Sequence, residues 1–554
     1  MLRSTVAAAA ASLGLPALGT PSRPDDTAGA GPAARPARID VHLELHAGED
    51  AVALRPGAPT RVWRYRATLL RGDPAVLEAM PHSYLGPVIR LRRHQRVRID
   101  FVNDLPESTI VHWHGLHLPA AMDGHPRDAI APGSRFVYEF TVVDRAGSYW
   151  FHPHPDGRTG KQVWFGLAGL LLIGDDEEDR LGLPSGRHDL PLVIQDRSFD
   201  DDNQFVYLGQ RIGDPQSSAA GAAMSDGRTG GMMGRMGPGG MMGRGRSGMG
   251  EMMAGMMGVL GDEILVNGRR GARVAVEARP YRLRLLNASN TRICKLAWND
   301  GSRLTAIASD GGLLAAPLQR DYLVLGPAER ADLWVDFGHW PAGTELTLQS
   351  LAFEGGMPSM GGMGGMMGAM MGSAALPDGA AFPVLELHIN GKAEARSTPP
   401  QRLSNLPPPD PRRVARAGAP KVFDITMGMM RWGINGRSFE MEGVSPLETV
   451  KLGTDEVWEF RNGASMMPMA HSMHVHGLQF RVLGRSDDGS APGIRKTVEA
   501  GYLDEGWKDT VLVMPGERVR ILLRFTDFSG LFIYHCHMLE HEDSGLMRNY
   551  LVQA

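Results

Sequence analysis

The sequence predicts an all-β protein made of β-sandwiches, and three observations lead to this fold class. Short runs rich in β-branched and apolar residues alternate with polar residues, as half-buried strands do. Turn residues interrupt these runs often, which is typical of two-layer sandwiches. The two ends of the chain also repeat one glycine-to-histidine spacing. The clearest strand-like runs lie at 97–102, 135–142, 282–286 and 518–525.

The repeated spacing indicates that the two ends are copies of one unit. Residues 147–154 and 530–537 each begin with glycine and end with a His-x-His pattern. A His-x-His-Gly segment precedes each of them, at 112–115 and at 474–477. We therefore expect the first and last parts of the chain each to contribute half of one histidine cluster.

At the N-terminus, residues 1–37 begin with one basic residue and a short apolar run, and continue as a stretch rich in Ala, Pro, Gly and Asp. The first part resembles a secretory signal, and the second part reads as a disordered lead. The apolar run is too short to span a membrane. We expect a periplasmic or secreted protein without a membrane span. The alternatives for this segment are an unstructured cytoplasmic tail and a misplaced start codon.

The remaining length is sufficient for several domains. A chain of 554 residues allows roughly three to four domains, and its 43% hydrophobic content can fill their cores. We place the domains at 38–180, 188–395 and 413–554, with a Pro-rich linker at 396–412. The middle domain has no histidine pairs, so its expected role is spacing and covering.

The histidine pattern predicts metal chemistry. Ten of the 19 histidines fall in four short segments, and one segment places Cys536 between His535 and His537. Residues i and i+2 of a strand share a face and lie roughly 6–7 Å apart, which suits two imidazoles in one metal cluster. Cys536 would face the other way from its neighbours. His471, three residues before His474, would face the same side as Cys536.

Ligand chemistry favours copper. One thiolate with two imidazoles, from Cys536, His471 and His541, is the trigonal ligand set of blue-copper electron-transfer sites. A structural zinc site closes with four ligands and is usually rich in cysteine, whereas this chain has two cysteines in all. The other cysteine, Cys294, then has no partner, so we expect no disulfide and a core position for Cys294.

The four segments resemble the four copper-binding motifs of the multicopper oxidases and occur in that family's order. The resemblance implies three cupredoxin-like β-sandwich (Greek-key) domains and four coppers per chain, one of type 1, one of type 2 and two of type 3. It implies type 1 ligands His471, Cys536 and His541, and type 2 ligands His112 and His474. The type 3 ligands would be His114, His152, His154, His476, His535 and His537.

The chain departs from the family pattern at two positions. Ser472 stands where the family often has proline, which should change only local stiffness. The axial position of the type 1 copper falls on Leu546, which cannot coordinate and should raise the reduction potential. Met547 becomes the ligand instead if the turn shifts by one residue.

Two carboxylates, Asp123 and Glu542, match acidic residues that the family uses as proton donors. Together with Cys536, through which the electrons are expected to pass, they are the expected catalytic residues. Carboxylates suit proton donation if burial raises their pKa toward the working pH. The alternatives are a turn residue before Gly124 for Asp123 and an ion-pair partner for Glu542. Asp509 is a candidate to orient a histidine ligand from behind.

Methionine is concentrated in two glycine-rich segments, 224–258 and 355–373. The first has eleven methionines and the second has seven. Glycine at this density opposes regular structure, so we expect mobile inserts on the middle domain. Thioether sulfur prefers copper(I), which predicts a role in handling that ion. The alternative is low-complexity filler.

Methionines near the type 1 ligands indicate the electron donor. In the family's cuprous oxidases such residues hold substrate copper(I), and Met427, Met467 and Met469 match these positions. Packing at a domain interface is their alternative role. We expect an oxidase that couples oxidation of copper(I) to reduction of dioxygen to water, for copper tolerance. The alternatives are a laccase-like oxidase of phenols and aryl amines, and a copper-sequestering protein without turnover.

The expected partners are therefore dioxygen and a small donor, copper(I) or a phenol or aryl amine. The net charge of -4 provides no electrostatic footprint for nucleic acid. We expect the protein to be a monomer.

Overall fold

The computed structural model describes most of the chain after residue 37. The described residues are 38–214, 256–355, 376–391, 397–407, 414–415, 419–428, 431–464 and 468–554. The signal-like lead, almost all of both methionine-rich segments and Met467 lie outside them. None of the helices in the described ranges is both long and apolar enough to cross a membrane.

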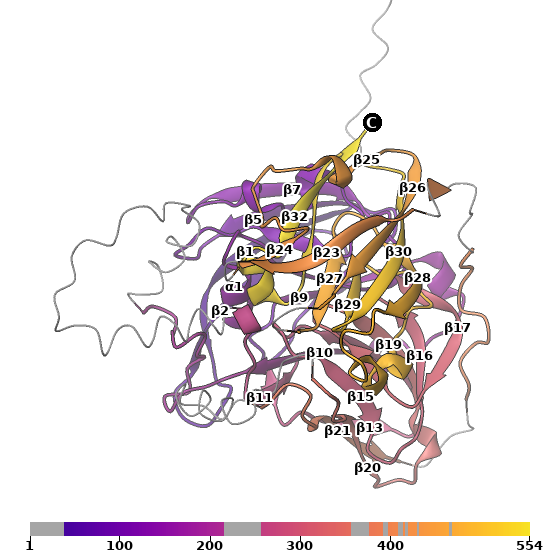
Figure 1. The fold of residues 1–554 in the computed structure, drawn as a ribbon. Helices are drawn as coiled ribbons and strands as arrows, with labels where there is room; N and C mark the ends of the chain where they lie inside the picture. Colours follow the sequence, from indigo (N-terminus) through magenta and orange to yellow (C-terminus); the bar gives the residue numbers. More distant parts are fainter. Residues whose placement is uncertain are drawn as a thin grey trace, which may run out of the picture. The chain divides into compact units, whose positions relative to one another are not determined.

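The strands of the described residues form six sheets, two in each of three successive parts of the chain (Figure 1). We call these parts the first, second and third sections and define them as 41–174, 189–390 and 414–553. Each section supplies most of one cluster of buried apolar side chains. The fold is therefore all-β, as the sequence predicts. The domain boundaries at 38–180, 188–395 and 413–554 remain a proposal, and each range contains one pair of sheets.

The first section combines a four-stranded and a five-stranded sheet. The four-stranded sheet contains, in spatial order, β2 (Thr60–Arg71), β1 (Val41–Val52), β5 (Arg96–Asn103) and β7 (Arg135–Thr141). The five-stranded sheet contains β3 (Leu77–Glu78), β4 (Val88–Arg92), β9 (Gly169–Gly174), β8 (Gly147–Pro153) and β6 (Val111–His114). Strands β5 and β7 confirm the predicted runs at 97–102 and 135–142. Buried residues alternate with partly buried ones along most of β5, so one face of this strand packs into the core.

The second section has a seven-stranded and a five-stranded sheet. The larger contains β12 (Arg269–Arg270), β11 (Glu263–Val266), β10 (Asp189–Arg197), β14 (Pro280–Asn287), β19 (Arg330–Asp336), β16 (Leu304–Ser309) and β17 (Gly312–Arg320). The smaller contains β13 (Arg273–Glu277), β21 (Phe382–Asn390), β20 (Glu345–Ser350), β15 (Cys294–Trp298) and β18 (Leu323–Leu325). Strand β14 confirms the run at 282–286. Cys294 is fully buried in the apolar core, as predicted, and is a free thiol.

The third section has a six-stranded and a five-stranded sheet. The first contains β24 (Arg431–Ile434), β23 (Lys421–Gly428), β26 (Thr454–Arg461), β30 (Glu517–Phe525) and β28 (Phe480–Asp487), with β22 (Val414–Ala415) paired to β26. The second contains β25 (Thr449–Lys451), β32 (Met547–Gln553), β31 (Gly530–Cys536), β27 (His471–Val475) and β29 (Thr510–Val513). Strand β30 confirms the run at 518–525.

The repeated spacing at the two ends becomes two equivalent strand pairs. In the first section β6 pairs antiparallel with β8, and His112 lies opposite His152. In the third section β27 pairs antiparallel with β31, and His474 lies opposite His535. A short helix follows each pair, and these helices contact each other. They are α1 (Thr159–Trp164) and α6 (Leu539–Asp543), and a further helix, α2 (Asp176–Asp179), follows β9.

The described part of the predicted linker, 397–407, has no regular secondary structure but is bound to the first section and its adjoining helix. The Ser404 hydroxyl accepts a hydrogen bond from Arg145 at 2.6 Å and donates one to Glu177 at 2.9 Å. This part of the linker is therefore held against the folded chain.

Candidate metal centres

Cys536 and two histidines form a compact buried group in the third section. Cys536 ends β31, His471 begins β27 and His541 lies in α6. Cys536 Sγ lies 3.5 Å from His471 Nδ1 and 3.7 Å from His541 Nδ1, and the two Nδ1 atoms are 3.2 Å apart. All three side chains are fully buried. We call these residues the cysteine–histidine group, and they fit the ligand set of a blue-copper site.

The strand register separates Leu546 from Met547. Met547 pairs with His535 across β31 and β32, so its side chain lies on the same face as that of His535. Cys536 faces the other way because side chains alternate along a strand. The carbonyl of Leu546 accepts the Cys536 N–H at 3.0 Å, and Leu546 belongs to the buried cluster that contains Cys536. The arrangement favours Leu546 as the neighbour of the sulfur.

An indole ring packs against both histidines of the cysteine–histidine group, a contact that the sequence analysis did not find. The ring of Trp432, in β24, lies 4.8 Å from the ring of His471 and 4.8 Å from that of His541. Trp432 is buried, and its Nε1–H donates to the carbonyl of Met256 at 2.9 Å. The C-terminal end of segment 224–258 therefore lies beside this group.

Eight further histidines meet where the first and third sections touch. Three sets of ligand atoms lie within 4.8 Å of one another, namely those of His112, His114 and His474, of His114, His152 and His537, and of His154, His476 and His535. All eight side chains are buried. Because each set draws on both sections, this cluster forms only when the two sections are in contact. We call these eight residues the histidine cluster.

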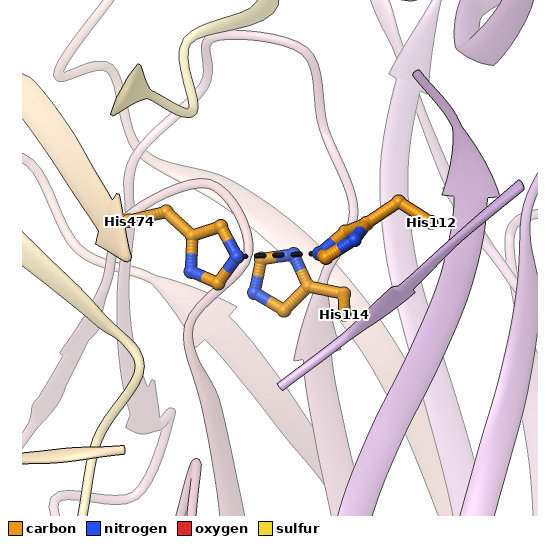
Figure 2. A group of neighbouring side chains, drawn as sticks. All are labelled: His112, His114 and His474. Carbon is orange, nitrogen blue, oxygen red and sulfur yellow. Dashed lines mark hydrogen bonds between the residues drawn. The ribbon is translucent and has the colours of Figure 1, made fainter. Parts of the chain in front are cut away.

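The hydrogen bonds of His112 and His474 leave two lone pairs facing each other. His112 Nδ1 donates to the carbonyl of Asp123 at 2.6 Å, and His474 Nδ1 donates to the carbonyl of Asp509 at 2.8 Å. Each neutral ring then carries its lone pair on Nε2, and the two Nε2 atoms are 3.4 Å apart. Figure 2 shows these two rings joined by the dashed line, with His114 beside them. Lone pairs at this distance repel unless a cation lies between them, so the pair fits a metal ion.

Five of the six other histidines of the cluster turn their Nε2 atoms inward in the same way. His152 Nδ1 and His535 Nδ1 each approach the carbonyl of the following residue, at 2.9 and 3.1 Å. Their Nε2 atoms then face other imidazoles. His537 Nε2 lies 3.3 Å from His152 Nε2, while His154 Nε2 and His476 Nε2 lie 3.3 and 3.1 Å from His535 Nε2. Two convergent sets of nitrogens result, as a pair of metal ions would require.

Burial keeps nine of these imidazoles neutral, as metal ligation requires. It lowers the pKa of His152 and of His541 to about 3 and that of His154 to about 4. Burial also lowers the pKa of six further histidines to well below its usual value. These are His112, His114, His471, His474, His476 and His537. It raises the pKa of the Cys536 thiol to about 12, so a bound cation is needed to hold the thiolate at neutral pH.

Asp123 and Glu542 both contact the histidine cluster. Asp123 Oδ2 lies 2.8 Å from His476 Nδ1, and Glu542 Oε2 lies 3.1 Å from His535 Nδ1. Burial raises the pKa of Asp123 to about 8. Burial also acts to raise the pKa of Glu542, but His154 and His535 lower it to about 2. Asp123 is therefore the carboxyl that can hold a proton near neutral pH.

Asp509 lies behind the histidine cluster, where the sequence analysis expected a residue that orients a ligand. Its Oδ1 lies 3.0 Å from His114 Nε2. Arg330, in the second section, binds the same carboxylate with two hydrogen bonds. No local sequence pattern marks Arg330, because it lies 179 residues away from Asp509 and belongs to no motif. The second section therefore does more than the predicted spacing and covering.

The structure describes two of the three methionines predicted to hold substrate copper. Met469 is buried in the apolar cluster that contains Cys536, and Met427 is partly buried and packs against that cluster. Met467 lies outside the described residues. The described methionine sulfurs are thus near the third-section core, which also suits their alternative role as packing residues.

Comparisons with known proteins agree with this geometry. Family models described as multicopper oxidase match residues 64–178 and 415–554. A laccase from Bacillus stratosphericus is 29% identical over 549 residues and covers 92% of each chain. A laccase from Haloferax volcanii is 31% identical, over 81% of this chain and 68% of the relative. The crystal structure of the McoA multicopper oxidase from Aquifex aeolicus has a TM-score of 0.69 and 31% identity, over 93% of this chain and 96% of that chain.

Proposed function

The chain belongs to the multicopper oxidase family, and from this premise we propose that it oxidises copper(I) and passes the electrons to dioxygen. The proposed physiological role is copper tolerance. Membership of the family is the basis for the oxidase activity, with oxygen as the electron acceptor. The choice of copper(I) as donor rests on the residues described below.

Eleven side chains would hold four copper ions. We assign the type 1 copper to Cys536, His471 and His541, and the type 2 copper to His112 and His474. The type 3 pair takes His114, His152, His154, His476, His535 and His537. When bound, these coppers supply one-electron redox couples and the site at which dioxygen is reduced to two waters. The donor set of thiolate and neutral imidazoles suits copper.

The observation that carries the proposal is the place of Cys536 between the two centres. Its sulfur belongs to the cysteine–histidine group, while its neighbours His535 and His537 belong to the histidine cluster. The backbone between them is a short covalent path for electrons. A protein that only sequesters copper needs no such path, so this arrangement supports an oxidase.

The surroundings of Trp432 support copper(I) as the donor. Its ring packs on His471 and His541, and its Nε1–H binds the carbonyl of Met256. The segment that contains eleven methionines between residues 224 and 257 therefore ends beside the proposed type 1 ligands. Thioether sulfur prefers copper(I), so such a segment suits delivery of that ion.

Oxygen uptake by the copper-loaded protein tests this choice. We expect faster uptake with copper(I) than with a phenol at low donor concentration. Deletion of 224–253, which keeps Met256 and its bond to Trp432, should lower kcat/KM for copper(I) and leave that for the phenol unchanged or higher. A control of unchanged length, with serine in place of the methionines of 224–253, should behave like the deletion. Unchanged copper(I) oxidation at low copper in both variants contradicts a role of the segment in delivery.

A laccase-like oxidase of phenols and aryl amines is the second candidate. Two relatives described above carry the name laccase, which supports it. The same uptake assay separates the candidates, because a laccase-like enzyme would turn over the phenol faster and gain nothing from the methionine-rich segment. Absence of uptake with either donor in protein loaded with four coppers would instead favour sequestration.

We also propose export to the periplasm or out of the cell, on the basis of the signal-like pattern in 1–37. Cell fractionation with an antibody against the folded chain tests it. Recovery of the protein in the cytoplasm alone contradicts export.

A further inference from the structure

The second section holds none of the predicted copper ligands, yet one of its side chains reaches the back of the histidine cluster. Arg330 begins β19 and is fully buried. Its Nη1 and Nη2 donate to Asp509 Oδ1 and Oδ2 at 2.6 and 2.5 Å. Two parallel bonds of this kind fix both the position and the plane of a carboxylate.

Asp509 connects the two halves of the histidine cluster. Its Oδ1 accepts a hydrogen bond from His114 Nε2 at 3.0 Å, and its backbone oxygen accepts one from His474 Nδ1 at 2.8 Å. His114 belongs to the first section and His474 to the third. With Nε2 turned to Asp509, His114 presents Nδ1 to the cluster, 3.4 Å from His152 Nε2. The orientation of two ligand rings therefore depends on where Asp509 lies.

Asp123 holds another pair of rings in the cluster in the same way, one ring from each section. Its backbone oxygen accepts from His112 Nδ1 at 2.6 Å, and its Oδ2 accepts from His476 Nδ1 at 2.8 Å. Its Oδ1 has no hydrogen-bond partner among the described residues. Of these two aspartates, the described structure gives a guanidinium partner to Asp509 alone. The two aspartates therefore differ in how firmly they are held.

We propose that Arg330 is a positioning residue for the histidine cluster. It holds Asp509 in the place from which its carboxylate orients His114 and its backbone carbonyl orients His474. The inference rests on the proposed function, because the ligand roles of these two histidines are part of it.

The remaining hydrogen bonds of Arg330 help to connect it to all three sections. Its other N–H groups donate to the carbonyls of Ser148, Ala328 and Asp310 at 2.9, 3.1 and 3.1 Å. Ser148 lies in the first section and Asp509 in the third, so this one side chain bonds to all three sections. The five donors of a guanidinium are all used. Correct placement of Asp509 is thereby linked to correct assembly of the three sections.

A nearby cation shows what a lysine can do in this setting. Lys508 Nζ lies 3.1 Å from a carboxylate oxygen of Asp310 and 3.1 Å from one of Glu329. Lysine acts as a point charge and lacks the planar fork that binds both oxygens of one carboxylate. Arg330→Lys therefore keeps the buried charge and removes the geometry that the proposal requires.

The test compares Arg330→Lys with Arg282→Lys in the copper-loaded full chain. Arg282 is an equally buried arginine of the same section, whose Nε and Nη2 bind Asp332 at 2.9 and 2.6 Å, away from the cluster. The readouts are copper per chain, the type 1 absorption, the type 2 electron paramagnetic resonance signal and oxygen uptake. Arg330→Lys should keep the type 1 absorption and change the type 2 signal. Its type 2 occupancy should fall at least twofold, and its oxygen uptake about 10–100-fold, as changes behind a metal ligand typically do.

Arg282→Lys should lower the melting temperature and leave copper content and both spectra unchanged. The inference is overturned if Arg330→Lys keeps the wild-type type 2 signal, or if both variants lose type 1 and type 2 copper alike. If Arg330→Lys does not fold, Asp509→Asn replaces it, because it keeps the side-chain shape and weakens the same pair of bonds. The same selective change is expected there, and an unchanged type 2 signal overturns the inference. A wild-type protein that binds copper without a type 1 absorption contradicts the proposed function instead.

Discussion

Leu546 shows how one residue can set the electron affinity of a metal centre. It lies in the apolar cluster around Cys536, whereas the register of β31 and β32 places Met547 on the face of His535. A leucine cannot donate to copper, so copper(II) at this site would lack the stabilisation that a thioether gives. We expect a high reduction potential for the type 1 copper.

Leu546→Met should therefore lower that potential, because a weak axial sulfur stabilises copper(II) more than copper(I) at this site. A redox titration followed by the type 1 absorption measures the change. Met547→Leu is the matched control and should leave the potential unchanged, since Met547 faces away from the sulfur. A higher potential in the control, with no change in Leu546→Met, would mean that the axial position belongs to Met547.

Helix α6 carries His541, a proposed type 1 ligand, and Glu542, which contacts the histidine cluster. Its Glu540 is buried and accepts hydrogen bonds from Tyr207, Asn290, Thr291 and the Val259 N–H at 3.1, 2.7, 2.7 and 3.2 Å. Tyr207 and Val259 lie on either side of the first methionine-rich segment. One carboxylate thus holds the helix of His541 against described residues that precede and follow that segment.

Glu540→Ala should destabilise the protein, because it leaves buried donors of Asn290 and Thr291 without acceptors. Each buried unsatisfied group costs about 1–3 kcal/mol. Urea denaturation followed by the type 1 absorption measures the loss. Glu540→Gln keeps one acceptor oxygen and should lose less. Equal stability of the alanine variant and the wild type contradicts this role of Glu540.

At the scale of the whole molecule, metal binding and assembly are coupled. The histidine cluster draws four residues from the first section and four from the third, and Arg330 bonds to both sections from the second. Copper that binds this cluster binds the assembled chain and not the unfolded one. Any ligand that binds only the folded state stabilises that state.

Removal of copper with a chelator should therefore lower the melting temperature. Free copper at about 1,000 times its dissociation constant stabilises a fold by about 4 kcal/mol. Differential scanning calorimetry of the loaded, chelated and reloaded protein measures the effect. Reloading with copper should restore the melting temperature of the loaded protein. Equal melting of the chelated and loaded forms would show that the cluster is assembled without help from the metal.

The features that the sequence predicts are those set by neighbouring residues in the chain. The strand runs and the His-x-His pairs were predictable because alternation along a strand decides which neighbours share a face, as β6, β8, β27 and β31 show. Trp432 and Arg330 were not, since their partners lie far away in sequence and no local pattern separates Arg330 from Arg282. The choice between Leu546 and Met547 needed the register of two strands.

Replacement of Cys536 by serine tests the central claim most directly. A hydroxyl keeps the size of the side chain and removes the thiolate whose two sequence neighbours belong to the histidine cluster. We predict that Cys536→Ser loses the intense blue absorption and its oxygen uptake, while the type 2 signal of the histidine cluster remains. Persistence of both the blue absorption and oxygen uptake in this variant would contradict the account.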